Sequence, residues 1–150
     1  MDKKYTTKTA KETQSIGQKI AKDVVKKNGF NHATVLLLRG NLGGGKTTFL
    51  QGFAKGLGVK EKVLSPTFAI MKKFKIIKSK NFNYFYHLDC YRINKPEEIL
   101  ELGFKEIIYD PKNIVAVEWP EKIEKYLEKN LTEIHFKFID QDQREITFKM

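Results

Sequence analysis

The sequence contains one cysteine, Cys90, so it cannot form a disulfide bond within the chain. No apolar run approaches the roughly 20 residues that a membrane-spanning helix needs. The opening residues, MDKKYTTKTAKETQS, lack the apolar core of a secretory signal. Together these absences predict a cytoplasmic protein with no membrane contact.

Arginine is also scarce. Of 28 basic residues, only Arg39, Arg92 and Arg144 are arginines, and the others are lysines spread along the chain. Proteins that read nucleic-acid sequence favour the forked guanidinium group of arginine. The net charge of +10 fits an acidic partner such as RNA, but it is more typical of a solvated, lysine-rich surface.

The remaining composition fits one folded domain. The 150 residues are 41% hydrophobic and 31% charged, which is typical of a globular protein with a real core. The sequence shows no repeat, low-complexity tract or linker. We therefore expect a single domain over residues 1–150.

The hydrophobic pattern predicts alternating helices and strands. A helix is expected over residues 9–29, with Thr9 and Glu12 forming a capping box. The nearly continuous apolar run 33–40 is typical of a strand buried on both faces, and a helix is expected over 47–58. The further expected elements are two strands joined by a turn within 67–89, a short helix over 95–103, a buried strand over 113–119, a surface helix over 120–130 and a hairpin over 133–150.

A glycine-rich loop separates the expected strand 33–40 from the helix that follows it. Residues 40–47, GNLGGGKT, match G-x-x-x-x-G-K-[ST], the pattern of a phosphate-binding loop. Glycines let backbone N–H groups turn inward around an anion, and the helix N-terminus adds partial positive charge. Lys46 can reach the β- and γ-phosphates, while the hydroxyl of Thr47 can hold Mg²⁺. The residues expected to contact the nucleotide through this loop are Asn41, Leu42, Gly43, Gly44, Gly45, Lys46, Thr47 and Thr48.

Such a loop needs an acid at the end of a neighbouring strand, and the sequence offers two. Asp89 ends the aromatic run YFYHLD, and Glu118 ends the apolar run IVAVE. One acid is expected to hold the metal, directly or through water, and the other to orient the attacking water. The pattern alone does not decide which does which.

Two further segments bear on the nucleotide. The nearest match to the guanine-binding pattern N-K-x-D is residues 94–97, which has the wrong acid and opens a helix, so ATP is the expected nucleotide. Residues 65–68, SPTF, indicate a plain turn. The alternative is a switch loop in which the hydroxyl of Ser65 or Thr67 senses the γ-phosphate.

Several of these segments together resemble the TsaE family, the small P-loop ATPases of bacterial tRNA threonylcarbamoyladenosine biosynthesis. The resemblance rests on GNLGGGKTTFLQGFAKGLG, SPTF, HLDCYR, ILELGF and VEWPEK, in the family's order and spacing. It runs from about Glu12 to Glu121, with a looser β pattern beyond. Asn41 and Gly44 depart from the family's usual G-D-L-G-A-G-K-T, but neither supplies the lysine or the metal hydroxyl. The resemblance implies a three-layer α/β fold of the P-loop NTPase type, with a central, mostly parallel sheet, additional antiparallel strands and a C-terminal hairpin.

The resemblance also implies roles for the polar residues. Thr47 and Glu118 correspond to the Mg²⁺ pair, and the expected catalytic residues are Lys46, Asp89 and Glu118. Asp89 resembles either a catalytic acid near the γ-phosphate or a residue just outside the direct ligands of the metal.

Four other residues gain an interpretation in the same way. Thr67 resembles part of a switch loop, and Trp119 corresponds to a tryptophan near the nucleotide and the partner surface. Arg92 matches a position that either stabilises transition-state charge or forms a structural ion pair. His87 is expected to support the strand end more than to take part in chemistry.

Finally, the resemblance implies partners. A TsaE-type subunit binds the TsaB–TsaD complex, in which TsaD transfers the threonylcarbamoyl group to adenosine 37 of tRNA. The subunit hydrolyses ATP, slowly when alone, to support repeated turnover, and tRNA would be reached through the complex. The isolated chain is expected to be a monomer or a nucleotide-dependent oligomer. Two alternatives are a small-molecule kinase, which needs an acceptor site and a basic lid, and a nucleotide-dependent RNA-binding module.

Overall fold

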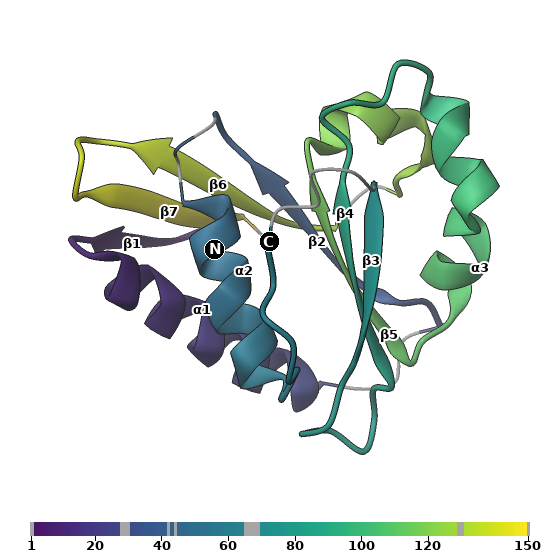
Figure 1. Cartoon of the computed structure of the whole chain (residues 1–150), viewed down its shortest axis with the longest axis horizontal. Helices are drawn as coiled ribbons and strands as arrows, with labels where there is room; N and C mark the ends of the chain where they lie inside the picture. The colour runs from purple at the N-terminus through teal and green to yellow at the C-terminus, as the bar shows by residue number, and fades with distance from the viewer. Residues whose placement is uncertain are drawn as a thin grey trace.

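The structure is a computed structural model that describes residues 2–27, 31–41, 43, 45–64, 70–128 and 131–149. Helices and strands alternate along most of the chain (Figure 1). In chain order the elements are β1 (Lys3–Thr7), α1 (Ala10–Val25), β2 (Thr34–Arg39), α2 (Lys46–Gly56), β3 (Met71–Lys75), β4 (Tyr84–Asp89), the 3₁₀ helix η1 (Pro96–Leu102), α3 (Phe104–Tyr109), β5 (Asn113–Glu118), the 3₁₀ helix η2 (Pro120–Tyr126), β6 (Thr132–Phe138) and β7 (Arg144–Lys149).

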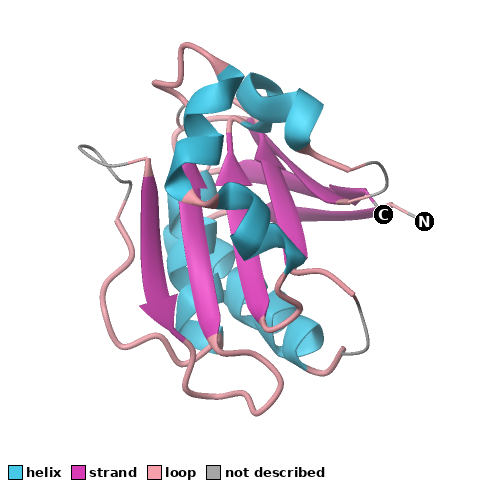
Figure 2. Cartoon of the chain, turned by 90° about the vertical axis from the view of Figure 1, so that its right-hand side faces the viewer, coloured by secondary structure: helices cyan, strands magenta, loops and turns pink. Residues whose placement is uncertain are grey.

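The described strands form one seven-stranded sheet in the order β1-β7-β6-β2-β5-β4-β3. The central strands β6, β2, β5 and β4 run parallel, and the outer strands pair antiparallel at both edges. Helices cover both faces of this sheet (Figure 2). The structure thus confirms the expected three-layer α/β fold with a parallel centre and a C-terminal hairpin. Strands from both halves of the chain share this sheet. The single domain over residues 1–150 stays a prediction.

Strand β2 shows how the apolar pattern builds two core layers. Side chains alternate between the faces of a strand. Leu36 and Leu38 pack in the layer that contains the α2 residue Phe53, whereas Val35 and Leu37 pack in the opposite layer. A strand that is covered on both faces has no polar face, which explains the nearly continuous apolar run in the sequence.

Helices α1 and α2 lie side by side, and glycines allow their backbones to approach closely. A Cβ atom on Gly17 would lie 2.2 Å from the carbonyl oxygen of Phe49. A Cβ atom on Gly52 would lie 2.0 Å from the carbonyl oxygen of Gln14. Real side chains do not tolerate such distances to backbone atoms, so the packing of α1 against α2 requires glycine at both positions.

We predict that Gly52→Ala destabilises the protein. The added methyl group must push α1 and α2 apart, and we expect the free energy of unfolding to fall by about 2 kcal/mol, although alanine favours a helix over glycine. Urea unfolding followed by circular dichroism measures this change. Ser15→Ala, at an exposed position of α1, is the matched control. Equal stability of the two variants would contradict the close helix contact.

Most of the predicted elements are confirmed, with differences at their ends. The side chain of Thr9 caps α1 by accepting a hydrogen bond from the backbone N–H of Glu12, at 3.1 Å. The Glu12 carboxylate accepts from the backbone N–H of Lys8 and not from that of Thr9, so the expected capping box is displaced by one residue. The helix ends at Val25, before the predicted end at residue 29, which lies outside the described residues.

The remaining differences concern short elements. Strand β1 and helix α3 are not among the elements predicted from the sequence. The expected helices at 95–103 and 120–130 are 3₁₀ helices, and η2 is anchored by the fully buried side chain of Ile123. Of the helices in the described part of the chain, none combines the length and hydropathy needed to cross a membrane.

Candidate functional site

The glycine-rich loop joins the carboxyl end of β2 to the start of α2. The φ angles of Gly40, Gly43 and Gly45 are +135°, +83° and +97°. Backbone with such positive φ angles favours glycine, because glycine lacks a Cβ atom. A Cβ atom on Gly40 would also lie 2.3 Å from the carbonyl oxygen of Phe136 in β6. The glycines are therefore required by the conformation of the loop and its contact with the neighbouring strand.

The other residues expected in this loop differ in their burial. Asn41 is exposed next to Gly40, and Thr47 and Thr48 are half-buried in the first turn of α2. Leu42 and Gly44 lie outside the described residues.

Lys46, the first residue of α2, is the one buried lysine in the described part of the chain. Its Nζ atom donates a hydrogen bond to the carbonyl oxygen of Gly40 at 2.6 Å and lies 4.1 Å from the centre of the Trp119 ring. Burial lowers the pKa of Lys46, while the nearby carboxylates of Glu118 and Asp89 oppose that shift. The ammonium group is thus enclosed at the start of the helix, between the loop and two acids.

The sheet register brings the two predicted acids together. Asp89 at the end of β4 lies opposite Glu118 at the end of β5, and Glu118 also lies opposite Leu38 of β2. Side-chain alternation places Asp89 and Glu118 on the face of the sheet that α1 and α2 cover. Glu118 is buried and Asp89 is half-buried. The structure therefore assembles the predicted group of Lys46, Asp89 and Glu118 from three separate segments.

A buried histidine completes this group. His87 of β4 is fully buried, and its Nε2 atom lies 2.6 Å from Oε2 of Glu118. Its Nδ1 atom is buried without a hydrogen-bond partner. From the sequence, His87 is expected to support the strand end, whereas the structure shows that it contacts one of the candidate acids directly.

The residues present fit a magnesium ion that is shared with a nucleotide. In the part of the chain described, no three His, Cys, Asp or Glu side chains gather closely enough to hold a metal ion by themselves. Magnesium at phosphate-transfer sites commonly takes one or two protein oxygens and completes its shell with phosphates and water. Thr47 and Glu118 offer a hydroxyl group and a carboxylate of this kind.

Trp119 closes the site on the side of β5. Of the described residues other than glycine, it alone has a positive φ angle, at +55°. This turn redirects the chain from β5 into η2 and lays the indole against Lys46, with the Tyr91 ring 5.0 Å away between centres. Trp119 therefore contacts the loop lysine, and its place beside a nucleotide stays a prediction.

Arg39 holds the segment that follows Trp119. Its guanidinium group forms ion pairs with Glu121 and Glu124 of η2, at 3.4 and 3.0 Å, and with Glu133 of β6, at 3.0 Å. Arg39 directly precedes the glycine-rich loop, so these contacts tie the loop, η2 and β6 into one unit.

The turn after β4 contains two residues already singled out in the sequence. Cys90 is fully buried, and this burial, with the charge of Asp89 close by, raises the pKa of its thiol to about 12. The thiol therefore stays protonated and is unsuited to be a nucleophile. Arg92 is exposed in the same turn. Thr67, the expected switch-loop residue, lies outside the described residues.

The β6–β7 hairpin lies beside the glycine-rich loop. The sequence predicts the hairpin but does not predict this contact. A Cβ atom on Gly45 would lie 3.6 Å from Cγ of Arg144, and one on Gly43 would lie 3.9 Å from Cδ2 of Phe138. The Arg144 guanidinium group in turn lies 4.7 Å from the centre of the half-exposed Phe138 ring. No local sequence signal marks these residues, because β-sheet pairing alone brings the hairpin to the loop.

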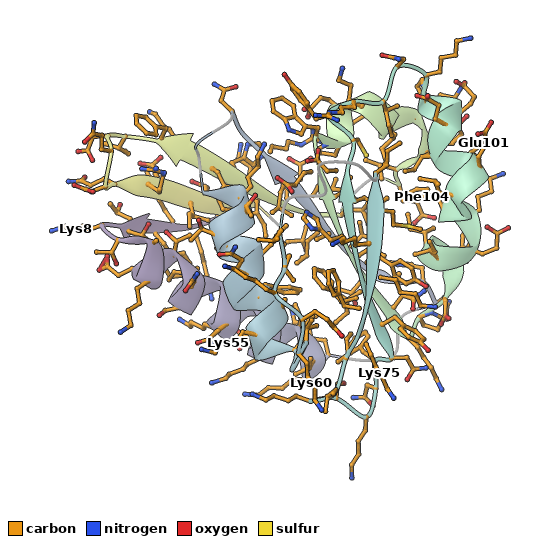
Figure 3. The ribbon with its side chains drawn as sticks, in the orientation of Figure 1. Lys8, Lys55, Lys60, Lys75, Glu101 and Phe104 are labelled. Atoms are coloured by element: carbon orange, nitrogen blue, oxygen red, sulfur yellow. The ribbon has the colours of Figure 1, made fainter. Side chains whose placement is uncertain are left out.

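Three of the lysines lie away from this site. The side chains of Lys55, Lys60 and Lys75 point outward from the end of the molecule opposite the start of α2 (Figure 3). All three are exposed, as the expectation of a solvated lysine-rich surface requires.

A parallel strand, a glycine-rich loop, a helix that begins with lysine and acids at two adjacent strand ends define a P-loop protein. Comparison with known proteins makes the assignment specific. The family described as Threonylcarbamoyl adenosine biosynthesis protein TsaE matches residues 7–146. The chain belongs to the TsaE family, which confirms the resemblance noted in the sequence.

Individual relatives agree with this assignment. The chain is 37% identical to the Rickettsia typhi protein named tRNA threonylcarbamoyladenosine biosynthesis protein TsaE, over 97% of this chain and 93% of that protein. It is 41% identical to the Bacillus subtilis protein of the same name, over 76% of this chain and 68% of that protein. The crystal structure of YdiB from B. subtilis matches with a TM-score of 0.71 and 32% identity, covering 99% of this chain and 84% of that one.

Proposed function

We propose that this chain is the ATPase subunit of the cytoplasmic machinery that makes N6-threonylcarbamoyladenosine at position 37 of tRNA. In this proposal it binds the TsaB–TsaD complex and hydrolyses ATP to support repeated turnover of that complex. Membership of the TsaE family and the names of its relatives support the pathway. The observation that carries the proposed activity is the enclosure of Lys46 in the glycine-rich loop beside Glu118 and Asp89.

The phosphates of ATP would bind at the glycine-rich loop, against the free backbone N–H groups of the N-terminus of α2. Lys46 would exchange its contacts with the Gly40 carbonyl and the Trp119 ring for the β- and γ-phosphates. Because the ammonium group is buried, its charge acts on the phosphates with little screening by water. This exchange positions the γ-phosphate at the ends of β4 and β5.

Glu118 and Asp89 would have different roles in hydrolysis. Thr47 and Glu118 would hold Mg²⁺, which when bound neutralises charge on the β- and γ-phosphates. Asp89 is half-buried and so keeps contact with solvent, which suits a residue that orients the attacking water. Its Oδ1 atom accepts a hydrogen bond from the backbone N–H of Tyr91 at 3.0 Å, which restrains the carboxylate.

The contacts of Lys46 support a slow rate for the isolated chain. Phosphate binding must displace a hydrogen bond to Gly40 and a ring contact with Trp119 before the lysine can act. Trp119 directly precedes η2, and η2 is tied to Arg39 through Glu124, so a partner that binds η2 would change the position of the Trp119 ring.

The test is ATP hydrolysis by the purified chain, alone and with a TsaB–TsaD dimer. We expect a slow rate alone and a faster rate with the dimer, with ATP preferred over GTP. Absence of any response to the dimer would contradict the proposed partnership. Fast phosphoryl transfer to a nucleoside or sugar would indicate a kinase. Salt-sensitive tRNA binding without hydrolysis would indicate an RNA-binding module.

A further inference from the structure

The contact between His87 and Glu118 follows from the register of two buried strands. His87 of β4 lies opposite Ala116 of β5, two residues before Glu118 on the same face of the sheet. The small side chain of Ala116 leaves room for the imidazole to reach diagonally along the sheet. Nε2 of His87 thereby comes within 2.6 Å of Oε2 of Glu118, with both residues buried.

The bonding of the imidazole indicates why a histidine occupies this place. A carboxylate that holds a cation is ionised and only accepts hydrogen bonds, so with a metal on Glu118 the Nε2 atom of His87 would donate its hydrogen to Oε2. Nδ1 is the one side-chain nitrogen or oxygen in the described part of the chain that is fully buried and unpaired. An apolar side chain would fill the same space without burying an unpaired nitrogen. The contact between Nε2 and Glu118 therefore offsets the free-energy cost of burying the unpaired Nδ1 atom.

The two carboxylate oxygens of Glu118 have different surroundings. Oε2 is held by His87. Oε1 has no hydrogen-bond partner among the described residues. Oε1 is thus the oxygen of Glu118 that is left for a ligand, and Lys46 is near enough for the charge of Glu118 to raise the pKa of its ammonium group.

We propose that His87 is a positioning residue for Glu118. By donating to Oε2, it fixes the carboxylate so that Oε1 faces the position of the magnesium–nucleotide complex. His87 itself touches neither the nucleotide nor the metal. This inference rests on the proposed function, in which Glu118 and Thr47 hold Mg²⁺.

The test compares three variants of the full chain. In His87→Gln the side-chain amide N–H can take the place of Nε2–H. In His87→Asn the amide is too short to reach Glu118, and His87→Leu has no donor. Each protein is titrated with Mn²⁺ in the presence of the ATP analogue AMP-PNP, and free Mn²⁺ is measured by electron paramagnetic resonance. Affinity for AMP-PNP in EDTA is measured separately.

We expect His87→Gln to bind Mn²⁺ about as the unmodified protein does, and His87→Asn and His87→Leu to bind it about tenfold more weakly. Affinity for AMP-PNP in EDTA should not change in any variant. In a Glu118→Gln background, His87→Asn should cause no further loss, because the residue through which His87 acts has already been altered.

The outcomes separate the inference from the proposed function. Equal Mn²⁺ affinity in all variants would overturn the positioning role while leaving nucleotide binding intact. Equal losses in His87→Gln and His87→Asn, or a loss that also appears in EDTA, would identify a structural role and overturn it as well. Failure of the unmodified protein to bind AMP-PNP would instead reject the proposed function. If His87→Leu does not fold, the comparison of glutamine with asparagine still decides.

Discussion

Replacing Lys46 with alanine is expected to lower ATP turnover by at least about 100-fold, because the substitution removes the positive charge that stabilises the phosphates during transfer. Lys46 is buried and donates to the Gly40 carbonyl, so nothing on the surface can take over its position. The measurement is phosphate release under saturating ATP, together with a direct titration of nucleotide binding.

The control for this prediction is Lys55→Ala on the same helix. Lys55 is exposed near the opposite end of α2, and its removal deletes an equal charge without touching the loop (Figure 3). We expect Lys55→Ala to hydrolyse ATP at the unmodified rate. If Lys46→Ala did so too, the glycine-rich loop could not be the site of hydrolysis.

The second large effect is expected for Glu118→Gln. The amide keeps the size of the side chain but loses the charge that would hold Mg²⁺ beside the phosphates. We expect turnover to fall by at least about 100-fold, with nucleotide affinity in EDTA unchanged or higher because a carboxylate near the phosphates has been neutralised. Phosphate release over a range of Mg²⁺ concentrations, with nucleotide titration in EDTA, measures both effects.

Two further variants serve as comparisons for Glu118→Gln. Glu101→Gln removes a carboxylate from the exposed surface of η1 and should leave turnover unchanged (Figure 3). Asp89→Asn should also lower turnover but should keep the Mg²⁺ dependence of nucleotide binding, because Asp89 is proposed to orient water. If the two acids exchanged these outcomes, their proposed roles would have to be exchanged.

The parts of the site that could be predicted from sequence are those whose chemistry is local. The glycine-rich loop carries its glycines, lysine and threonine within eight positions, so the motif can be read without the fold. Asp89 and Glu118 could be proposed because each ends a recognisable buried strand. Which strands are adjacent is a property of the sheet, so only the structure establishes that the two acids lie directly opposite each other.

The contacts that were missed depend on register or on a distant strand. The approach of His87 to Glu118 needs the pairing of His87 with Ala116, which no pattern within either strand specifies. Arg144 reaches Gly45 only because its hairpin joins the sheet beside β2. Such facts arise from tertiary structure alone.

Helix α3 and strand β1 were not predicted from the sequence, for different reasons. Helix α3 did have a signal, since Phe104, Ile107 and Ile108 are spaced for one helical face, but the segment is only six residues long. Strand β1 is short and mostly exposed, with the sequence KKYTT, and its conformation is set by its pairing with β7. Local sequence preference cannot reveal a strand that a distant partner defines.

The pairing of β1 with β7 has a consequence for the order in which the protein can fold during its synthesis. β1 is the first of the described elements to leave the ribosome, yet Thr7 lies opposite Arg144, in the last strand to be made. The chain must therefore carry β1 unpaired until nearly all of the sheet has emerged. The charges of Lys3 and Lys4 help to keep that waiting strand from pairing with other chains. A chain that is released before β7 has been made leaves both β1 and the outer edge of β6 without their partners, so an incomplete chain exposes two strand edges at once.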